Sequence, residues 1–368
     1  MARVVIGLSG GVDSSVAAYL LKQQGHDVVG LFMINWHDTT GTLEGDCPWH
    51  DDRVFAELVA KKLDIPLHVV DLSADYRTRV VDYMFSEYEK GRTPNPDVLC
   101  NREIKFDVFL REALRLGADF VATGHYCRKA EETLPDGRTI YKLLAGTDPN
   151  KDQSYFLCQL SQEQLRYALF PVGALLKPEV RRIAAEQGLA TAKRKDSQGI
   201  CFLGNIDYNE YVRRYLGEQP GDIIEQETGR IIGQHKGLWF HTIGQRKGLG
   251  LGGGPWFVIR KDVEQNILYV SHGYDPATAY KRDFAIHDFD FLTEGVTSVP
   301  DRITFKIRHT PEFHCATVET LPDGRMVVHS DDPIHGVAPG QFCVVYDQAH
   351  HRCYGSGEIA WAQETPKA

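Results

Sequence analysis

The feature that most constrains the fold is an apolar run that leads into a glycine- and serine-rich loop and then into a helical pattern. Val4–Leu8 predicts a strand, Gly7–Ser14 a loop, and Ser14–Gln24 a helix that ends at Gly25. In this arrangement backbone N–H groups and a helix N-terminus can surround a polyphosphate. The loop therefore predicts a phosphate site at the carboxyl end of a first parallel strand.

Strand and helix patterns keep alternating through the first half of the chain. Further strands are expected at Asp27–Ile34, Leu67–Leu72 and Asp119–Thr123, and helices at Asp52–Leu63, Tyr76–Lys90, Asn101–Leu116 and Pro178–Gln187. Strands separated by helices form right-handed βαβ units, so we expect an α/β, Rossmann-like domain with a parallel sheet. The turn at 135–137 predicts a hairpin within this region.

The pattern changes near residue 205. Asp207–Leu216 is the last sizeable helix expected, and short alternating runs separated by turn residues follow it. We therefore predict a catalytic domain over 1–204, a small, mainly β central domain over 205–277 and a C-terminal β-barrel domain over 278–368.

The N-terminus decides how the cysteines are interpreted. Met1–Ile6 enters a strand directly, without a signal or transit pattern, and no apolar run is long enough for a bilayer. We expect a cytoplasmic protein with no membrane partner, whose eight cysteines form no disulfide framework. No Cys-x-x-Cys pair occurs, and the loop Asn35–His50 is expected to be solvated, so no metal site is predicted. Five cysteines are expected to be small buried residues: Cys127, Cys158, Cys315, Cys343 and Cys353.

The formal net charge of −9 argues weakly against a nucleic-acid partner. The charge is unevenly distributed, however, because six basic and two acidic residues between Lys177 and Lys195 give a local charge of +4. A basic footprint for RNA and a solvated helix face explain this segment equally well, so both interpretations stay open here.

The phosphate loop lacks two common nucleotide-binding patterns. A Walker loop needs Gly-Lys-Ser/Thr and a dinucleotide loop needs Gly-x-Gly-x-x-Gly, and the stretch Gly7–Ser15 has neither. Ser9–Ser14 instead resembles the loop of the ATP pyrophosphatase superfamily. Members of that superfamily cleave ATP between its α and β phosphates and form a substrate adenylate.

Cys100 has surroundings that favour a reactive thiol. The expected helix 101–116 starts directly after it, and a helix N-terminus together with Arg102 and Lys105 would stabilise a thiolate. Asp97 is close enough in sequence to exchange a proton. An inert cysteine at a helix start explains the local pattern equally well.

Cys201 lies in a basic, glycine-flanked loop over 193–204. Cations favour an anionic persulfide, and such a loop suits a sulfur that one partner loads and another receives. From the local sequence, a reactive and an inert cysteine are equally compatible with this position.

Six stretches spread over the whole chain resemble the bacterial tRNA-specific 2-thiouridylase family. They are Gly7–Ser14, Asn95–Asn101, Ala122–Tyr126, Asn150–Leu157, Gly199–Phe202 and His241–Gly250. The resemblance implies that ATP, with Mg²⁺, adenylates the C2 oxygen of a wobble uridine in tRNA. It also implies that Cys201 carries sulfur as a persulfide loaded by a sulfur-relay donor protein, and that Cys100 is the nucleophile that helps to release it through a Cys100–Cys201 disulfide.

The same resemblance implies a set of site residues. The catalytic residues are Cys100, Cys201 and Asp97. The ATP-binding residues are Gly7, Leu8, Ser9, Gly10, Gly11, Val12, Asp13, Ser14, Met33 and Gly124. Asn95, Pro96 and Asp97 contact the target base. The residues that contact or position tRNA are His125, Lys151, Asp152, Gln153, Arg308, His309 and Gln341, although Arg308–Pro311 departs from the family's more polar stretch and puts the contact of His309 in question.

Two other functions agree with parts of the sequence. An amide ligase of the same superfamily would use the phosphate loop but leave the two cysteines without a role. A non-catalytic RNA-binding or sulfur-carrier protein would leave the phosphate loop unexplained. ATP consumption with tRNA, measured with and without a sulfide donor, separates the three.

Overall fold

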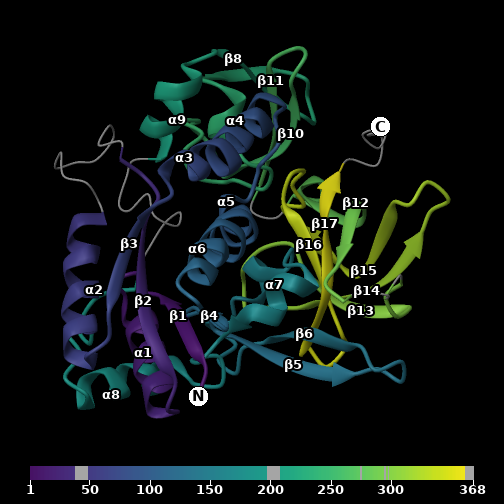
Figure 1. The fold of residues 1–368 in the computed structure, drawn as a ribbon. Helices are drawn as coiled ribbons and strands as arrows, with labels where there is room; N and C mark the ends of the chain where they lie inside the picture. The colour runs from purple at the N-terminus through teal and green to yellow at the C-terminus, as the bar shows by residue number, and fades with distance from the viewer. Residues whose placement is uncertain (38–48, 197–207, 274–275, 294–295, 297, 361–368) are drawn as a thin grey trace.

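Three β-sheets organise the chain, which a computed structural model describes apart from residues 38–48, 197–207, 274–275, 294–295, 297 and 361–368 (Figure 1). The first sheet is parallel throughout and has the strand order β3-β2-β1-β4-β7. Its strands are β1 (Arg3–Gly7), β2 (Asp27–Ile34), β3 (Leu67–Asp71), β4 (Phe120–Ala122) and β7 (Ala168–Leu169). The predicted α/β domain with a parallel sheet is therefore confirmed.

Helices cover both faces of this sheet because alternate residues of β1 are buried on opposite sides. Val4 and Ile6 pack with α1 (Val12–Gln23), α2 (Trp49–Leu63) and α8 (Lys177–Glu186), whereas Val5 packs with the helices on the other face. Those helices are α3 (Ser73–Tyr76), α4 (Asp82–Glu89), α5 (Pro96–Leu99) and α6 (Phe109–Arg115), with the π-helical stretches η1 (Arg77–Val81) and η2 (Cys100–Val108).

The helix expected over 101–116 begins earlier than predicted. Asn95 is the N-cap, its Oδ1 accepting a hydrogen bond of 3.3 Å from the backbone N–H of Val98, and Pro96 occupies the first helical position. The polypeptide then stays helical through α5, η2 and α6 to Arg115. Proline is favoured in a first helical turn, where no N–H partner is needed, so this start follows from the local sequence.

A mixed four-stranded sheet forms the central region. It follows α9 (Tyr208–Leu216), and its order is β10-β11-β8-β9. The strands are β8 (Gly221–Glu225), β9 (Ile231–His235), β10 (Trp256–Asp262) and β11 (Ile267–His272), and only the β8–β11 pair is parallel. The sheet encloses a small apolar core that includes Ile223, Val258 and Leu268.

The C-terminal strands close into a barrel, as predicted. Their order is β12-β15-β14-β13-β16-β17, and a further pairing of β12 with β17 completes the ring. The strands are β12 (Tyr280–Phe291), β13 (Arg302–Lys306), β14 (His314–Thr320), β15 (Met326–His335), β16 (Phe342–Tyr346) and β17 (Arg352–Ala360).

The predicted hairpin near 135–137 is present, and it belongs to the barrel sheet. It consists of β5 (Cys127–Thr133) and β6 (Thr139–Ala145), and β6 pairs with β17 through Leu144 opposite Arg352 and Leu143 opposite Cys353. The N-terminal half of the chain thus contributes a hairpin to the sheet that the C-terminal strands form. After the hairpin, the chain forms a 3-10 turn, Ser154–Leu157, and a short helix, α7 (Gln162–Tyr167). Among the described helices, none has the length and apolarity needed to cross a bilayer.

Candidate active site

Hydroxyl groups close the phosphate loop between β1 and α1. The Ser14 hydroxyl donates to the carbonyl of Gly11 at 3.1 Å and accepts a hydrogen bond of 3.3 Å from the backbone N–H of Ser9. The Ser15 hydroxyl donates to the same carbonyl at 2.7 Å. Gly10 has a φ of 75°, and a Cβ there would lie 2.2 Å from the carbonyl oxygen of Asp52, so only glycine fits this turn.

The remaining residues expected to bind ATP surround this loop. Gly124 lies two residues after the end of β4, and a Cβ on it would lie 2.6 Å from the backbone nitrogen of Ser14. Met33, near the end of β2, lies 3.8 Å from the position of a Cβ on Gly7. The expected residues therefore meet at the carboxyl edge of the parallel sheet, where ligands of such sheets usually bind.

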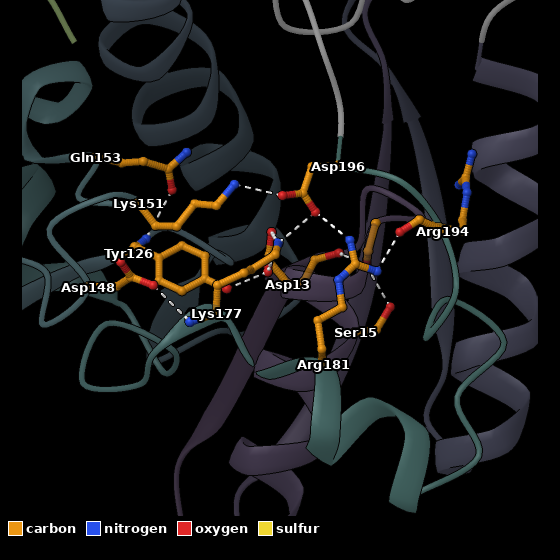
Figure 2. A network of polar contacts seen from close by, with 12 residues as sticks. Asp13, Ser15, Tyr126, Asp148, Lys151, Gln153, Lys177, Arg181, Arg194 and Asp196 are labelled. Atoms are coloured by element: carbon orange, nitrogen blue, oxygen red, sulfur yellow. Dashed lines mark hydrogen bonds and ion pairs between the residues drawn. The ribbon is translucent and has the colours of Figure 1, made fainter. Parts of the chain in front are cut away.

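Cations from two other segments converge beside the loop (Figure 2). The ammonium of Lys177 donates to both carboxylate oxygens of Asp13 at 2.8 Å and lies 2.9 Å from Asp196. Lys151 reaches the other oxygen of Asp196 at 2.7 Å, and Arg181 also pairs with this carboxylate. We call Lys151, Lys177, Arg181 and Asp196 the Asp196 cluster.

Arg194 joins this charged region to the loop itself. Its guanidinium donates to the carbonyl of Gly10 at 2.8 Å, pairs with Asp52 at 2.8 Å and lies 4.3 Å above the ring of Phe55. The basic segment 177–195 was open to two interpretations, and the described structure gives a third for Lys177, Arg181 and Arg194, which face the phosphate loop. Only Lys193 and Lys195 of the 193–195 stretch are exposed.

The charges keep Asp196 ionised. Burial alone would raise its pKa, but hydrogen bonds from Lys151 and Lys177 and their positive charges outweigh burial and hold the pKa well below its usual range. Asp13 also accepts a hydrogen bond of 2.7 Å from the Tyr126 hydroxyl, and burial followed by the charge of Asp13 raises the pKa of that phenol. Sequence reasoning missed Asp196 entirely, although the density of cations around it in the sequence was visible.

Cys100 lies inside the helical segment rather than before it. The helix starts at Pro96, so the expectation that the Cys100 thiol sits at a helix N-terminus is wrong. The first turn contains Asp97 instead, and Cys100 is fully buried, with 0% exposure. Asn101 anchors this turn, since its side-chain amide donates to the carbonyls of Asp97 at 3.0 Å and Phe156 at 3.2 Å.

The C-terminal barrel holds the segment that precedes Cys100. The side-chain amide of Gln341 donates to the carbonyl of Thr93 at 2.8 Å and to that of Pro94 at 3.2 Å. The oxygen of Gln341 accepts a hydrogen bond of 3.3 Å from the Asn95 amide. The expected target-base residue Asn95 and the expected tRNA residue Gln341, which are 246 positions apart, therefore lie in direct contact.

A loop at 151–156 connects the phosphate loop with the Cys100 helix. Gln153 accepts a hydrogen bond of 3.0 Å from the backbone N–H of Tyr126, next to Asp13, and the Phe156 carbonyl holds Asn101. Asp152 lies between them, 4% exposed and 3.5 Å from the buried ammonium of Lys306. A continuous chain of contacts thus joins the two parts of the site.

The expected tRNA residues differ in burial, since His125 and Asp152 are buried, Arg308 is half-buried and His309 is exposed. His125 is 8% exposed, and burial followed by the charge of Lys105 lowers its pKa. The guanidinium of Arg308 donates to the carbonyls of Gly336 at 2.9 Å and Ile243 at 3.3 Å, which links the barrel to the central region. His309 binds the carbonyl of Asp152 at 2.8 Å. The expected roles of these residues in contacting or positioning tRNA stay predictions.

The cysteines that the structure describes differ in burial. Cys201 and Cys47 lie outside the described residues, so the predicted persulfide position and the Cys100–Cys201 pairing remain predictions. Cys127, Cys158, Cys343 and Cys353 are buried as expected, and burial raises the pKa of Cys158 to about 12. The expectation for Cys315 is wrong, because this residue is exposed on β14. Its strand alternates, and the residue falls on the outer face.

Comparison with known families assigns each part of the chain. Residues 2–205 match the family described as tRNA methyl transferase HUP domain. Residues 209–272 match the tRNA methyl transferase PRC-barrel domain, and residues 281–359 match the aminomethyltransferase beta-barrel domain. These matches agree with the parallel sheet, the central β-sheet and the barrel described above.

Curated relatives match over almost the full length. A tRNA-specific 2-thiouridylase MnmA of Flavobacterium johnsoniae is 48% identical over 402 residues, covering 98% of this chain and 100% of the relative. A protein of the same name from Christiangramia forsetii is 47% identical, again over 98% of this chain and 100% of the relative. One from Parabacteroides distasonis is 49% identical over 96% of this chain and 97% of its own length. The chain therefore belongs to the tRNA-specific 2-thiouridylase family.

Proposed function

We propose that this chain is a tRNA-uridine 2-sulfurtransferase that uses ATP to replace the C2 oxygen of a wobble uridine with sulfur. The observation that carries the proposal is the continuous chain of contacts from the phosphate loop, through residues 151–156, to the Cys100 helix. An enzyme that activates a base with ATP and then thiolates it needs both sites within reach of one uracil ring.

The first step is adenylation. The uracil O2 attacks the α-phosphorus of ATP, the bond between the α and β phosphates breaks, and pyrophosphate leaves. The O2 atom becomes part of an AMP leaving group, which thiols can displace more easily than an oxide. Asn95, Pro96 and Asp97 would hold the base, which must leave the anticodon stack to reach them.

The second step transfers sulfur. The terminal sulfur of a Cys201 persulfide attacks C2, and AMP leaves. The thiolate of Cys100 then attacks the sulfur atom of Cys201, so that the bond to the transferred sulfur breaks and 2-thiouridine is released. A Cys100–Cys201 disulfide remains, and a two-electron thiol reductant restores both thiols.

Magnesium would accompany ATP. Asp13 provides a carboxylate beside the hydroxyls of Ser9 and Ser14, and oxygen donors of this kind suit Mg²⁺. Bound there, the ion would neutralise charge on the leaving pyrophosphate. The side chain of Lys177 would have to release Asp13 at the same time, because it binds both carboxylate oxygens.

Two partners complete the reaction. The tRNA substrate would meet the exposed Lys193 and Lys195 near the phosphate loop. Each turnover consumes one persulfide sulfur, so a sulfur-relay donor protein must reload Cys201. We propose a cytoplasmic location, because the reaction needs tRNA, ATP and a reducing thiol pool.

The test measures tRNA nucleosides by mass spectrometry after incubation with ATP, tRNA and a persulfide donor. The wild-type chain should form 2-thiouridine, whereas Cys100→Ser and Cys201→Ser should bind ATP and tRNA but form none. Cys201→Ser should also fail to accept labelled sulfur, whereas Cys100→Ser should accept it and hold it. The exposed Cys315→Ser is the matched control and should keep full activity. Thiolation at the wild-type rate by Cys201→Ser would contradict the persulfide step.

A further inference from the structure

The Asp196 cluster concentrates positive charge on a single carboxylate. Lys151 comes from the loop after the hairpin, and Lys177 and Arg181 come from the first turns of α8. All three contact Asp196, and Figure 2 shows their side chains pointing toward it from different directions. Bringing three like charges this close is unfavourable unless an anion holds them.

These ion pairs contribute little to the stability of the fold. The Asp196 side chain is 29% exposed, and those of Lys151 and Arg181 are 38% and 30% exposed. Partly exposed ion pairs contribute little to folding, because water screens them and because ordering long side chains costs entropy. The same exposure leaves Lys151 and Arg181 accessible to an anionic ligand, whereas the Lys177 side chain is 12% exposed and lies deeper, against Asp13.

The position of the cluster indicates which anion. Lys177 bridges Asp196 and the phosphate-loop residue Asp13, and Arg194 bonds to the loop carbonyl of Gly10. Four cations, Lys151, Lys177, Arg181 and Arg194, here face three carboxylates, Asp13, Asp52 and Asp196, which leaves 4 − 3 = +1. Replacing one carboxylate by a polyphosphate would reverse that imbalance and add several acceptor oxygens for the same donors.

We infer that the carboxylate of Asp196 is an internal substitute for phosphate, which holds Lys151, Lys177 and Arg181 in position until the β and γ phosphates of ATP displace it. The inference deepens the proposed function, because it assigns these cations to the leaving pyrophosphate. Asp196 then acts as a positioning residue. It keeps the cations together in the nucleotide-free protein and releases them to the ligand.

An exchange of this kind has a distinctive consequence. ATP must compete with Asp196, so removing the negative charge of Asp196 should tighten ATP binding, whereas a purely structural carboxylate would weaken or not affect binding when lost. AMP has no β or γ phosphate, so its affinity should not respond. Removing a cation has the opposite effect, because both the carboxylate and the phosphates lose a donor.

The experiment is calorimetric titration of the full-length chain, without tRNA, with magnesium α,β-methylene-ATP and separately with AMP. We expect Asp196→Asn to bind the triphosphate analogue roughly ten-fold more tightly, the scale of one charge-assisted hydrogen bond, and AMP within about two-fold of wild type. Lys177→Gln should bind the analogue at least about ten-fold more weakly. The thermal midpoint of Asp196→Asn should rise more than that of wild type when the analogue is added.

Asp148→Asn is the matched control. Asp148 also lies beside α8, but it accepts hydrogen bonds from the backbone N–H groups of Asn150 at 3.0 Å and Lys177 at 2.9 Å rather than from the cations. The same loss of charge there should not tighten binding of the analogue. Tightening in this control, or equal tightening for AMP, would mean that general electrostatics explains the effect and would overturn the inference.

Two further outcomes separate the inference from the proposed function. Unchanged or weaker binding of the analogue by Asp196→Asn, while wild type binds normally and makes 2-thiouridine, overturns the inference alone. Failure of the wild-type chain to bind the analogue contradicts the proposed function and the inference together.

Discussion

Two groups of cationic side chains in this molecule differ in whether they have a carboxylate partner. Around the phosphate loop, every lysine and arginine of the Asp196 cluster has a carboxylate within hydrogen-bonding distance. In the central region, Lys261, His235 and His241 lie close together, and each has a buried nitrogen with no hydrogen-bond partner among the described residues.

The difference decides which group can bind an anion. Burial lowers the pKa of Lys261 to about 7, and burial followed by the charges of His235 and Lys261 lowers the pKa of His241 to about 4. At neutral pH His241 is uncharged and Lys261 is only partly charged, so these groups attract an anion less than the paired cations do. The cations near the phosphate loop instead lie within hydrogen-bonding distance of carboxylates.

The largest effect is expected when two side chains of the phosphate loop are removed. Ser9→Ala combined with Asp13→Ala should abolish ATP turnover, because the hydroxyl and the carboxylate that would serve pyrophosphate and its magnesium are both lost. The affinity for tRNA should stay nearly unchanged, since neither residue is among those expected to contact tRNA. Pyrophosphate release and filter binding of tRNA measure the two effects, and wild-type turnover in the double variant would exclude this loop as the ATP site.

The second prediction compares a buried lysine that has a partner with one that has none. Lys306 is 2% exposed and pairs with Asp152, which is 4% exposed. Lys306→Met should lower the free energy of unfolding by about 3–5 kcal/mol, because it leaves a buried carboxylate without its cationic partner, although Gly146 and Ser154 still donate hydrogen bonds to Asp152. Denaturant unfolding measures the change, and a loss below about 1 kcal/mol would show that this pair behaves like a surface pair.

Lys261→Met should raise the free energy of unfolding, in contrast to Lys306→Met. Its folded pKa of about 7 lies below the usual lysine pKa of 10.5, so the unfolded chain holds more protons between these values. Wild-type stability should therefore rise as pH increases from about 7 to 10.5. The variant should be more stable by about 1–3 kcal/mol near pH 7, the usual cost of a buried unsatisfied donor.

The gain from Lys261→Met should fade toward pH 10.5, where neither the folded nor the unfolded wild type carries the full charge. Thermal melts over this pH range provide the measurement. Lys236→Met is the control, because the Lys236 side chain is 68% exposed and its removal should leave stability nearly constant. A pH-independent gain would mean that packing, rather than the charge of Lys261, causes it.

The smallest effect concerns cations that belong to neither group. Lys193 and Lys195 are exposed and adjoin the paired region. If they contact tRNA, Lys193→Ala with Lys195→Ala should reduce the slope of log affinity against log salt by up to about two units. The pair Lys61→Ala with Lys62→Ala on α2 serves as the comparison, and an equal reduction there would show that the effect is not local.

Local patterns predicted most of the parallel domain. The hydrophobic repeat and the glycine loop depend on neighbouring residues, so the strands, helices and the position of the phosphate loop could be read from short windows. The start of the Cys100 helix was missed, although Asn95 and Pro96 are a recognisable N-cap and first-turn pair. The strand β12 is harder to recognise, because its charged start, Lys281–Asp283, interrupts the alternation expected of a strand.

Contacts between distant segments could not be predicted in this way. Asp196 becomes significant only when Lys151 and Lys177 fold against it, and Gln341 touches Asn95 only after the barrel closes. Family resemblance supplied Asn95 and Gln341 as separate residues, whereas nothing in a single sequence indicated that they meet. The domain limits at 204 and 277 stay predictions, since the hairpin β5–β6 joins the sheet of the barrel.

That hairpin has a consequence for how the chain is made. Synthesis proceeds from the N-terminus, so β6 leaves the ribosome long before Arg352 and Cys353, its partners in the sheet. Until then, one side of β6 offers unpaired backbone groups next to Leu143, which is fully buried in the finished fold. A nascent or prematurely terminated chain therefore carries an open strand that can pair with another chain, and a chaperone that shields residues 139–145 would protect it until translation is complete.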